Sequence, residues 1–355
     1  MRLRLGILTA LTLLIAPTVS ATAAGQSDEV RAQHMSPPSW KHVDIKTKQG
    51  FRGLAAVDAT TAWVGGSEGG VWRTTDAGKT WDKVGPELKK PLLFRDVEAV
   101  DANTAQVLAI GPGRQSRIYR TTDGGATWAR TFTNRDQAAF YDCMAMYADG
   151  VHGLAMSDPV DGKFRIARTE DGGLTWSVLP RKGMPKAVEG EFGFAASGTC
   201  LVTAGEKHAY FASGGGASRI FFSKDWGTTW KVKRSPIPAA EAGGVFSLAF
   251  KDAKQGLAVG GDFTDPDNGE RMSAYGARLR WTRGGDLGGY RSGVAWLPGR
   301  KPVAVAVGPT GSDVTHDGGK TWKPFDKGSF DAVMCAADGS CWASGAEGAV
   351  AILRH

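Results

Sequence analysis

The sequence is poor in cysteine and has few long hydrophobic runs. Only 4 of its 355 residues are cysteine, which excludes a small module held together by disulfides. After the first two dozen residues, no uncharged stretch approaches the roughly 20 apolar residues that span a bilayer as a helix. The 43 Lys and Arg exceed the 36 Asp and Glu, for a formal charge of +7, but they form no concentrated basic block. We therefore expect neither stable membrane insertion nor a nucleic-acid partner.

Motifs for common cofactors and metals are missing as well. The chain has no G-x-x-x-x-G-K-S/T, no H-E-x-x-H and no G-x-S-x-G, and its six histidines are scattered. Four aspartates in polar insertions could bind a hard cation, but ordinary acidic turns explain them better: Asp158, Asp161, Asp262 and Asp265. The sequence therefore predicts no cofactor and no metal site.

Glycine, by contrast, is abundant, and the chain is apolar enough to bury a large core. Its 49 glycines are about twice the ordinary usage. Hydrophobic residues make up 42%, with 12 Trp and 15 Phe, which excludes a disordered chain. Because glycine suits tight turns and interrupts helices, this composition favours many short strands and an all-β fold.

The first residues are typical of a secretory signal peptide. Arg2 and Arg4 precede an apolar run from Leu5 to Ala16, and small residues follow up to Ala24. We predict a signal peptide over residues 1–24 and a flexible leader over residues 25–39. The remaining chain, residues 40–355, should then be a secreted or periplasmic protein.

One octapeptide recurs along the chain. It has the pattern Thr-x-Asp-x-Gly-x-Thr-Trp, with small variations, at residues 74–81, 121–128, 169–176, 223–230 and 315–322. The aspartates Asp76, Asp123, Asp171 and Asp225 are 47, 48 and 54 residues apart, and Asp317 follows after 92, or two periods of 46. A degraded copy over residues 282–290 occupies that gap. A period in the forties made of short strands is typical of β-propeller blades.

The repeated aspartates look structural. A short carboxylate at this position can accept hydrogen bonds from the turn that it starts, and the glycine two residues later supplies the positive φ of a hairpin loop. A role repeated at five places along the chain belongs to the architecture, so we assign Asp76, Asp123, Asp171, Asp225 and Asp317 to the fold and not to catalysis.

A second unit precedes each octapeptide and fixes the number of blades. It consists of an alternating strand, a turn and an apolar strand, as in residues 246–250 followed by 256–260, and seven such units can be counted. The seventh stops before any octapeptide, while Trp40–Asp44 resembles the strand that follows each one. We therefore predict a seven-bladed β-propeller, with an N-terminal strand that completes the last blade and removes an open sheet edge.

The four cysteines suit an oxidising compartment. Cys335 and Cys341 flank a hairpin turn and could form a disulfide across adjacent strands. Cys143 and Cys200 begin equivalent strands in neighbouring blades, so they either bridge the two blades or stay buried as free thiols.

The candidate binding residues lie where the first strands enter the central channel. Arg52, Arg95 and Arg291 come from blades one, two and six, and Asp142, Glu191 and Asp331 enter the first strands of other blades as their neighbours. Converging guanidinium groups would favour a carboxylate, a phosphate or an acidic peptide. The alternative is that these charges pair with one another and line a wet channel.

The octapeptides resemble the Asp-box, or bacterial neuraminidase, repeat. Together with Leu93–Val97 and Gly256–Gly260, they resemble the photosystem II assembly and stability factor family over about residues 40–353. That resemblance implies an exported, chaperone-like binding propeller with an arginine-bearing face, for which Arg52, Arg95 and Arg291 are the local candidates. Sialidases, other glycosidases and sorting receptors share the box.

An enzyme is the second hypothesis. The Phe/Tyr-Arg-Ile-Pro segment of sialidases is absent before the first box. A glycosidase would need two facing carboxylates, for which Asp142 with Glu191 or Asp331 are candidates, while Tyr141 with Glu191 could form a sialidase-like nucleophile pair. We favour a non-catalytic, monomeric propeller that binds a protein, or an anionic or glycan ligand, on its axial face.

Overall fold

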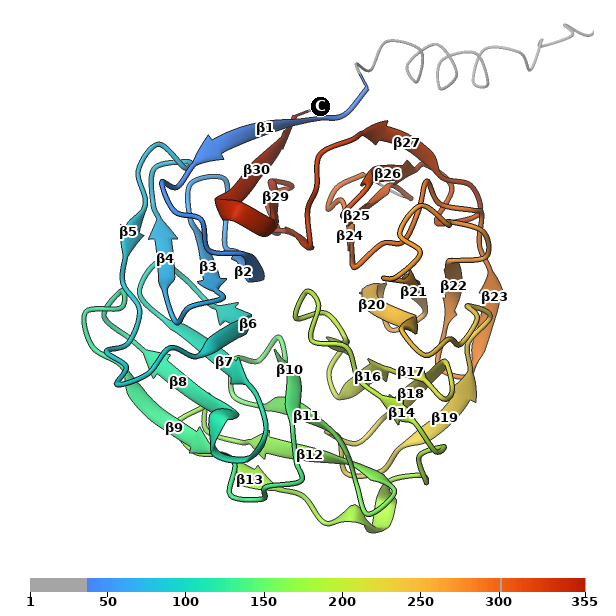
Figure 1. Cartoon of the computed structure of the whole chain (residues 1–355), viewed down its shortest axis with the longest axis horizontal. Helices are drawn as coiled ribbons and strands as arrows, with labels where there is room; N and C mark the ends of the chain where they lie inside the picture. Colours follow the sequence, from blue (N-terminus) through green and yellow to red (C-terminus); the bar gives the residue numbers. More distant parts are fainter. Residues whose placement is uncertain (1–36, 301, 355) are drawn as a thin grey trace, which may run out of the picture. The chain divides into compact units, whose positions relative to one another are not determined.

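Seven sheets of short antiparallel strands surround a central axis in the computed structural model, which describes residues 37–300 and 302–354 (Figure 1). The predicted signal peptide, residues 1–24, and most of the predicted leader lie outside the described residues. The ring itself spans Pro38–Arg354. Within the described residues, the helical elements are three short 3-10 turns: η1 (Gly113–Gln115), η2 (Arg181–Gly183) and η3 (Ala346–Gly348). No helix in these residues is long and apolar enough to cross a membrane.

The first three blades each contain four strands in consecutive order. Blade one consists of β2 (Phe51–Ala56), β3 (Ala62–Gly66), β4 (Val71–Thr74) and β5 (Asp82–Lys83). Blade two consists of β6 (Leu93–Ala99), β7 (Ala105–Ile110), β8 (Arg117–Thr121) and β9 (Ala129–Thr133). Blade three consists of β10 (Tyr141–Met146), β11 (Gly153–Val160), β12 (Lys163–Thr169) and β13 (Ser177–Val178).

Blades four and five are linked by an insertion. Blade four consists of β15 (Leu201–Ala204), β16 (His208–Ala212), β18 (Arg219–Ser223) and β19 (Lys231–Arg234). Blade five consists of β20 (Gly243–Asp252), β21 (Gln255–Asp262), β22 (Ser273–Ala277) and β23 (Arg280–Arg283). Two added strands, β14 (Glu191–Phe192) and β17 (Gly214–Gly215), extend its sheet to six on the inner side. Glu191 therefore does not open the inner strand of blade four, which begins ten residues later.

The last two blades close the ring. Blade six consists of β24 (Gly293–Trp296), β25 (Ala304–Gly308), β26 (Gly311–Thr315) and β27 (Lys323–Asp326). Blade seven combines β28 (Ala332–Cys335), β29 (Cys341–Ser344) and β30 (Ala349–Arg354) with the N-terminal strand β1 (Ser39–Asp44). β1 pairs along its whole length with β30, and the Trp40 indole donates to the Ser312 hydroxyl of blade six at 2.9 Å. The predicted seven blades and their N-terminal closure are confirmed.

Burial follows from the stacking of blades. The second strands β3 and β7 are buried at every residue, because a neighbouring blade covers each of their faces. One apolar cluster, for example, joins Trp63 of blade one to Val97 and Val107 of blade two. The core is thus distributed around the ring between adjacent sheets, and the inner strands are left to line the axis.

Each Asp box closes the hairpin between the third and fourth strands. In the first box, the Thr80 N–H and hydroxyl donate to the Asp76 carboxylate at 2.9 and 2.7 Å, and the Thr74 hydroxyl donates to it at 2.9 Å. These bonds to Thr80 hold the pKa of Asp76 down at about 2. The same bonds recur at Asp123, Asp171, Asp225 and Asp317. In blade five, β22 and β23 are joined by a two-residue turn, so the predicted degraded copy at 282–290 begins within the outer strand and is no box.

Both cysteine pairs are bonded. Cys335–Cys341 joins β28 to β29, where the two residues are direct register partners. Cys143–Cys200 joins β10 of blade three to the residue that precedes β15 of blade four. The bridging alternative therefore holds for the second pair, and no described cysteine is free.

Candidate functional site: an axial cleft

A cleft of about 530 Å³ opens at the axis, and blades one, two, three, five, six and seven all contribute side chains to it. Its walls combine charged groups with a row of aromatic rings. The lining residues are Arg52, Arg95, Phe140, Asp142, Asp158, Phe192, Gly193, Phe194, Ala195, Ala196, Phe246, Phe263, Tyr290, Pro309 and Asp331. The size is that of an ordinary small-ligand or peptide site.

Four of these side chains sit on β-bulges at the same point of their inner strands. The pairing of inner and second strand shifts register at Arg52, Arg95, Asp142 and Phe246. A bulge inserts one unpaired residue and re-aims its side chain. The preceding residue in each strand, such as Phe51 (0% exposed), packs into the core. In each of these four blades, the bulge therefore turns one residue toward the axis.

Arg52, Arg95 and Asp331 form one end of the cleft. The Arg52 Nε lies 3.5 Å from the Asp331 carboxylate, and the Arg95 guanidinium donates to the backbone oxygen of Ala195 at 3.1 Å. Burial lowers the pKa of Arg95 to about 10, and the nearby charge of Arg52 adds to that effect. Burial also raises the pKa of Asp331, which the two arginines partly offset. Two cations thus face one carboxylate, so this end carries a positive excess.

Asp142 and Asp158 form a carboxyl pair within the same cleft. Burial and the negative charge of Asp158 raise the pKa of Asp142 well above its ordinary value. Burial raises the pKa of Asp158 to about 6, although it accepts the Gly193 N–H at 2.7 Å. Burial and the mutual repulsion of the two groups therefore favour the protonated form of Asp142.

Aromatic rings line the side of the cleft formed by the insertion and blades five and six. Phe194 stacks on Phe246 with ring centroids 3.7 Å apart, and Phe246 meets Tyr290 edge to face at 4.7 Å. Phe263 lies beside Phe246 and is 53% exposed. An exposed phenylalanine beside a buried aromatic cluster offers an apolar surface to a ligand.

Arg291 does not join this cleft. Its guanidinium is 1% exposed and donates through Nε to the buried Asp313 carboxylate at 2.6 Å, and through Nη1 to Tyr290 O at 2.9 Å. The register of β24 explains this location. Val294 pairs with the second strand of its blade at the position where Leu54 pairs in blade one. Counting back three residues from each, Arg291 is equivalent to the core-facing Phe51 and not to Arg52, which lies on the bulge. We therefore leave Arg291 out of the candidate site.

Two of the candidate catalytic residues, Glu191 and Tyr141, lie outside the axial cleft, whereas Asp331, the other candidate partner of Asp142, lines it. Glu191 is buried and accepts hydrogen bonds from Arg219 and from the Ser213 hydroxyl, the latter at 2.5 Å. Tyr141 lines a separate pocket between blades two and three, and burial raises the pKa of its phenol. Of the three residues Tyr141, Asp142 and Glu191, the axial cleft includes Asp142 alone.

The acidic turns act locally. Asp262 accepts bonds from the N–H and hydroxyl of Thr264, Asp161 pairs with Arg181 at 2.8 Å, and Asp265 accepts from the Asn268 amide. Within residues 37–300 and 302–354, no group of three or more acidic, His or Cys side chains could hold a metal ion.

Several residues of the cleft escaped the sequence analysis. The segment Phe192–Ala196 reaches the axis through the pairing of β14 with β17, which no local pattern announces. Phe246 could have been found, because it occupies the same place before a Ser-Leu-Ala strand that Arg52 occupies before Gly-Leu-Ala.

Comparison with known proteins agrees with this architecture. The BNR/Asp-box repeat family matches residues 313–324. No curated protein sequence matches the chain. The solved structure of YCF48 bound to D1 peptide is similar over 90% of this chain and 96% of its own, with 16% identity and a TM-score of 0.63. YCF48 from Cyanidioschyzon merolae is similar over 88% and 98%, with 17% identity and a TM-score of 0.57.

Propeller enzymes are similar as well. The GH74 xyloglucanase from Xanthomonas campestris is 17% identical over 89% of this chain and 53% of its own, with a TM-score of 0.58. At these identities, the likenesses establish the propeller fold and leave the function to be argued from the site.

Proposed function

We propose that this protein is an exported, non-catalytic propeller that holds an acidic segment of a partner protein in its axial cleft. The observation that carries the proposal is the pair of arginines, Arg52 and Arg95, which two bulges turn into a cleft with an aromatic wall. A ligand carboxylate can replace Asp331 as the partner of Arg52 and gain charge-assisted hydrogen bonds. Apolar side chains beside that carboxylate would pack on Phe263 and Phe246.

The structures of YCF48 add support to a peptide as ligand. One of them is described as bound to D1 peptide, which makes a propeller of this architecture a known support for peptide binding. From YCF48 we take only the mode of binding, which is a peptide held by a propeller. The experiment below tests which peptides this protein binds.

The experiment uses purified protein and an array of peptides with and without acidic residues. We expect the double variant Arg52→Ala/Arg95→Ala to bind acidic peptides at least about tenfold more weakly, since a hydrogen bond to a charged group contributes about 1.5–3 kcal/mol. The control is Arg234→Ala/Arg280→Ala, which removes two exposed arginines from blades four and five. Equal binding by both double variants would remove the proposal.

Glycoside hydrolysis is the alternative, favoured by the carboxyl pair in the cleft and by the likeness to xyloglucanases. Its difficulty is geometric: glycosidase carboxyl groups stand about 5–10 Å apart on either side of the bond, whereas Asp142 and Asp158 lie on adjacent strands of one blade, β10 and β11. Asp331, the other carboxylate of the cleft, is paired with Arg52. A glycan panel tests it. Turnover that Asp142→Asn abolishes would establish an enzyme and overturn the non-catalytic proposal.

Export is part of the proposal. Two disulfides suit an oxidising compartment, and the first 24 residues read as a signal peptide. N-terminal sequencing of protein recovered from the secreted or periplasmic fraction should start at Ala24 or Gly25. Light scattering of that material should give the mass of a monomer.

A further inference from the structure

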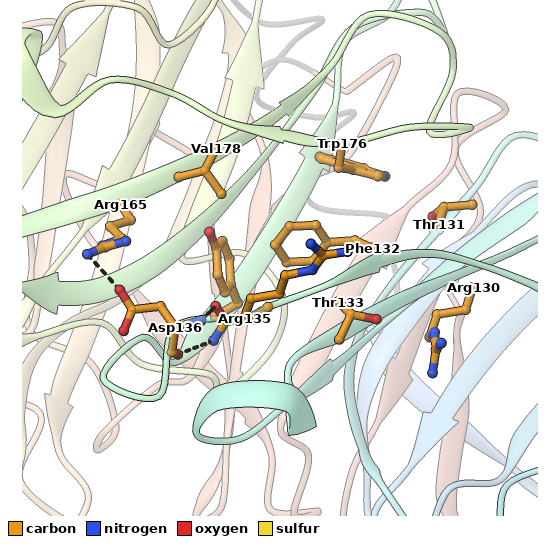
Figure 2. A pocket seen from close by; sticks show the side chains of 11 residues that line it. Arg130, Thr131, Phe132, Thr133, Arg135, Asp136, Arg165, Trp176 and Val178 are labelled. Atoms are coloured by element: carbon orange, nitrogen blue, oxygen red, sulfur yellow. Dashed lines mark hydrogen bonds and ion pairs between the residues drawn. The ribbon is translucent and has the colours of Figure 1, made fainter.

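A second pocket, of about 540 Å³, lies between blades two and three and shares no residue with the axial cleft (Figure 2). Strand β9 and the loop after it form one side, and β12 with the start of β13 form the other. Figure 2 shows Arg165 and Asp136 on one side of the pocket and Trp176 on another, with Arg135 extending between them.

The pocket carries an excess of positive charge. Arg130, Arg135 and Arg165 line it together with one acidic residue, Asp136. Arg165 Nη2 pairs with the Asp136 carboxylate at 2.7 Å. In the described part of the chain, neither Arg130 nor Arg135 forms a salt bridge, and both are exposed. Two cations are thus uncompensated, which favours an anionic ligand.

The loop that carries these charges is held firmly. The Asn134 side chain is buried, and its amide donates to the backbone oxygens of Gly113, Asp136 and Ala139 at 2.9–3.0 Å. Its oxygen accepts the Asp136 N–H at 3.0 Å. A fully bonded buried amide fixes the turn, so Arg135 and Asp136 are presented without the loss of loop entropy that ordering on binding would cost.

A hydrogen bond that joins blades one and two has no counterpart at the junction of blades two and three, where the pocket lies. At the junction of blades one and two, the indole of Trp128, the last residue of its Asp box, donates to Val84 O at 2.6 Å. The equivalent Trp176 indole has no acceptor among the described residues. Trp81 and Trp322 share that lack, so the free indole alone defines no site. The junction of blades two and three differs because Arg130, Arg135 and Arg165 line the same pocket as Trp176.

The remaining lining suits hydroxyl groups. Thr133 brings a hydroxyl to the pocket, whereas the Thr131 hydroxyl and the Tyr141 side chain are buried in its wall. A hydroxyl can donate and accept. A flat indole, a hydroxyl and guanidinium forks together fit a ring that carries both hydroxyls and a carboxylate.

We propose that this pocket between blades two and three is a second ligand site, for a carboxylated sugar such as a uronic acid unit. Arg135 and Arg130 bind the carboxylate, the Trp176 face packs on the sugar ring, and the Thr133 hydroxyl binds one of its hydroxyl groups. The size of the pocket is that of a site for one or two sugar units. The proposal is independent of the axial cleft, because the two sites have no residue in common.

The test titrates digalacturonic acid into the purified protein and follows the binding by calorimetry. We expect Arg130→Ala/Arg135→Ala to weaken binding at least about tenfold, because charge-assisted hydrogen bonds to the carboxylate are lost. Both residues are exposed, so the fold should tolerate the change. Two controls should bind as the unchanged protein does: Arg234→Ala/Arg280→Ala, and Arg52→Ala/Arg95→Ala in the axial cleft.

Three results would overturn the proposal. The first is failure of the expected dependence on the arginines, seen either as binding that the Arg130/Arg135 variant retains or as no measurable binding by the unchanged protein. The second is equal affinity for neutral galactobiose, which would show that the carboxylate is not recognised. The third is loss of sugar binding in the Arg52/Arg95 variant, which would place the sugar in the axial cleft. The binding of acidic peptides by that variant tests only the proposal for the axial cleft.

Discussion

At the scale of residues, one step along an inner strand decides what a charged side chain does. Arg52 occupies a bulge and faces the cleft, whereas Arg291 occupies the place before it and lies in the core. A buried guanidinium is tolerated there because its Nε–H donates to the carboxylate of Asp313, which is also fully buried, at 2.6 Å. The two arginines should therefore differ sharply in their contribution to stability.

We expect Arg291→Ala to lower the free energy of unfolding by about 3–5 kcal/mol, because it leaves the Asp313 carboxylate buried without a partner. Arg52→Ala should cost no more than about 1 kcal/mol, since its ion pair is partly exposed. Urea unfolding measures both. The double variant Arg291→Leu/Asp313→Leu should recover most of the loss; equal costs for Arg52→Ala and Arg291→Ala would contradict the assignment.

The carboxyl pair predicts a pH effect. The folded pKa of Asp142 lies well above its ordinary 3.8, so the folded state holds a proton that the unfolded chain releases. Above about pH 4, this group alone lowers stability by about 1.4 kcal/mol per pH unit until its folded pKa is reached. Asp142→Asn keeps the shape and polarity of the side chain but cannot take up that proton.

The expected result is a variant that matches the unchanged protein at about pH 4 and exceeds it in stability at pH 7, with a shallower pH slope. Chemical unfolding across this range measures the effect. The control Asp267→Asn, at an exposed aspartate, should leave the slope unchanged. Parallel slopes for Asp142→Asn and the unchanged protein would mean that Asp142 holds no proton in the fold.

At the scale of elements, the sequence predicts what is local and misses what is not. The Asp boxes were found because each of their hydrogen bonds joins residues within four positions, as between Asp76 and Thr80. The insertion was missed because β14 pairs with β17 across more than 20 residues and through two glycines, which carry no side-chain pattern. Glu191 consequently looked like an entry residue, although it anchors this insertion through Arg219.

The two disulfides should contribute unequally. Cys143–Cys200 spans 57 residues and ties blade three to blade four, whereas Cys335–Cys341 spans 6 within one hairpin. Loop-closure entropy then predicts a loss of about 4 kcal/mol for Cys143→Ser/Cys200→Ser and about 2 kcal/mol for Cys335→Ser/Cys341→Ser. Thermal unfolding without reductant compares them. With reductant, the difference between each variant and the unchanged protein should disappear.

At the scale of the whole molecule, the ring makes the site. The repeats in the sequence predict how many blades there are, but which side chains meet at the axis depends largely on bulges in four of the inner strands. No single blade contains the cleft, since its charged residues come from blades one, two, three and seven. Any change that opens the ring should therefore disturb the cleft from a distance.

The closing strand provides the test. Trp40 is 7% exposed, bonds to Ser312 of blade six and packs on Phe330 with centroids 5.3 Å apart. Trp40→Ala should lower the free energy of unfolding by about 3–5 kcal/mol, and loosening β1 should expose the edge of β30 and promote self-association. Thermal unfolding and light scattering measure the two effects. Lys41→Ala, at an exposed position of the same strand, should change neither by more than the about 0.5 kcal/mol of ordinary surface substitutions; if both variants behave alike, β1 does not hold the ring closed.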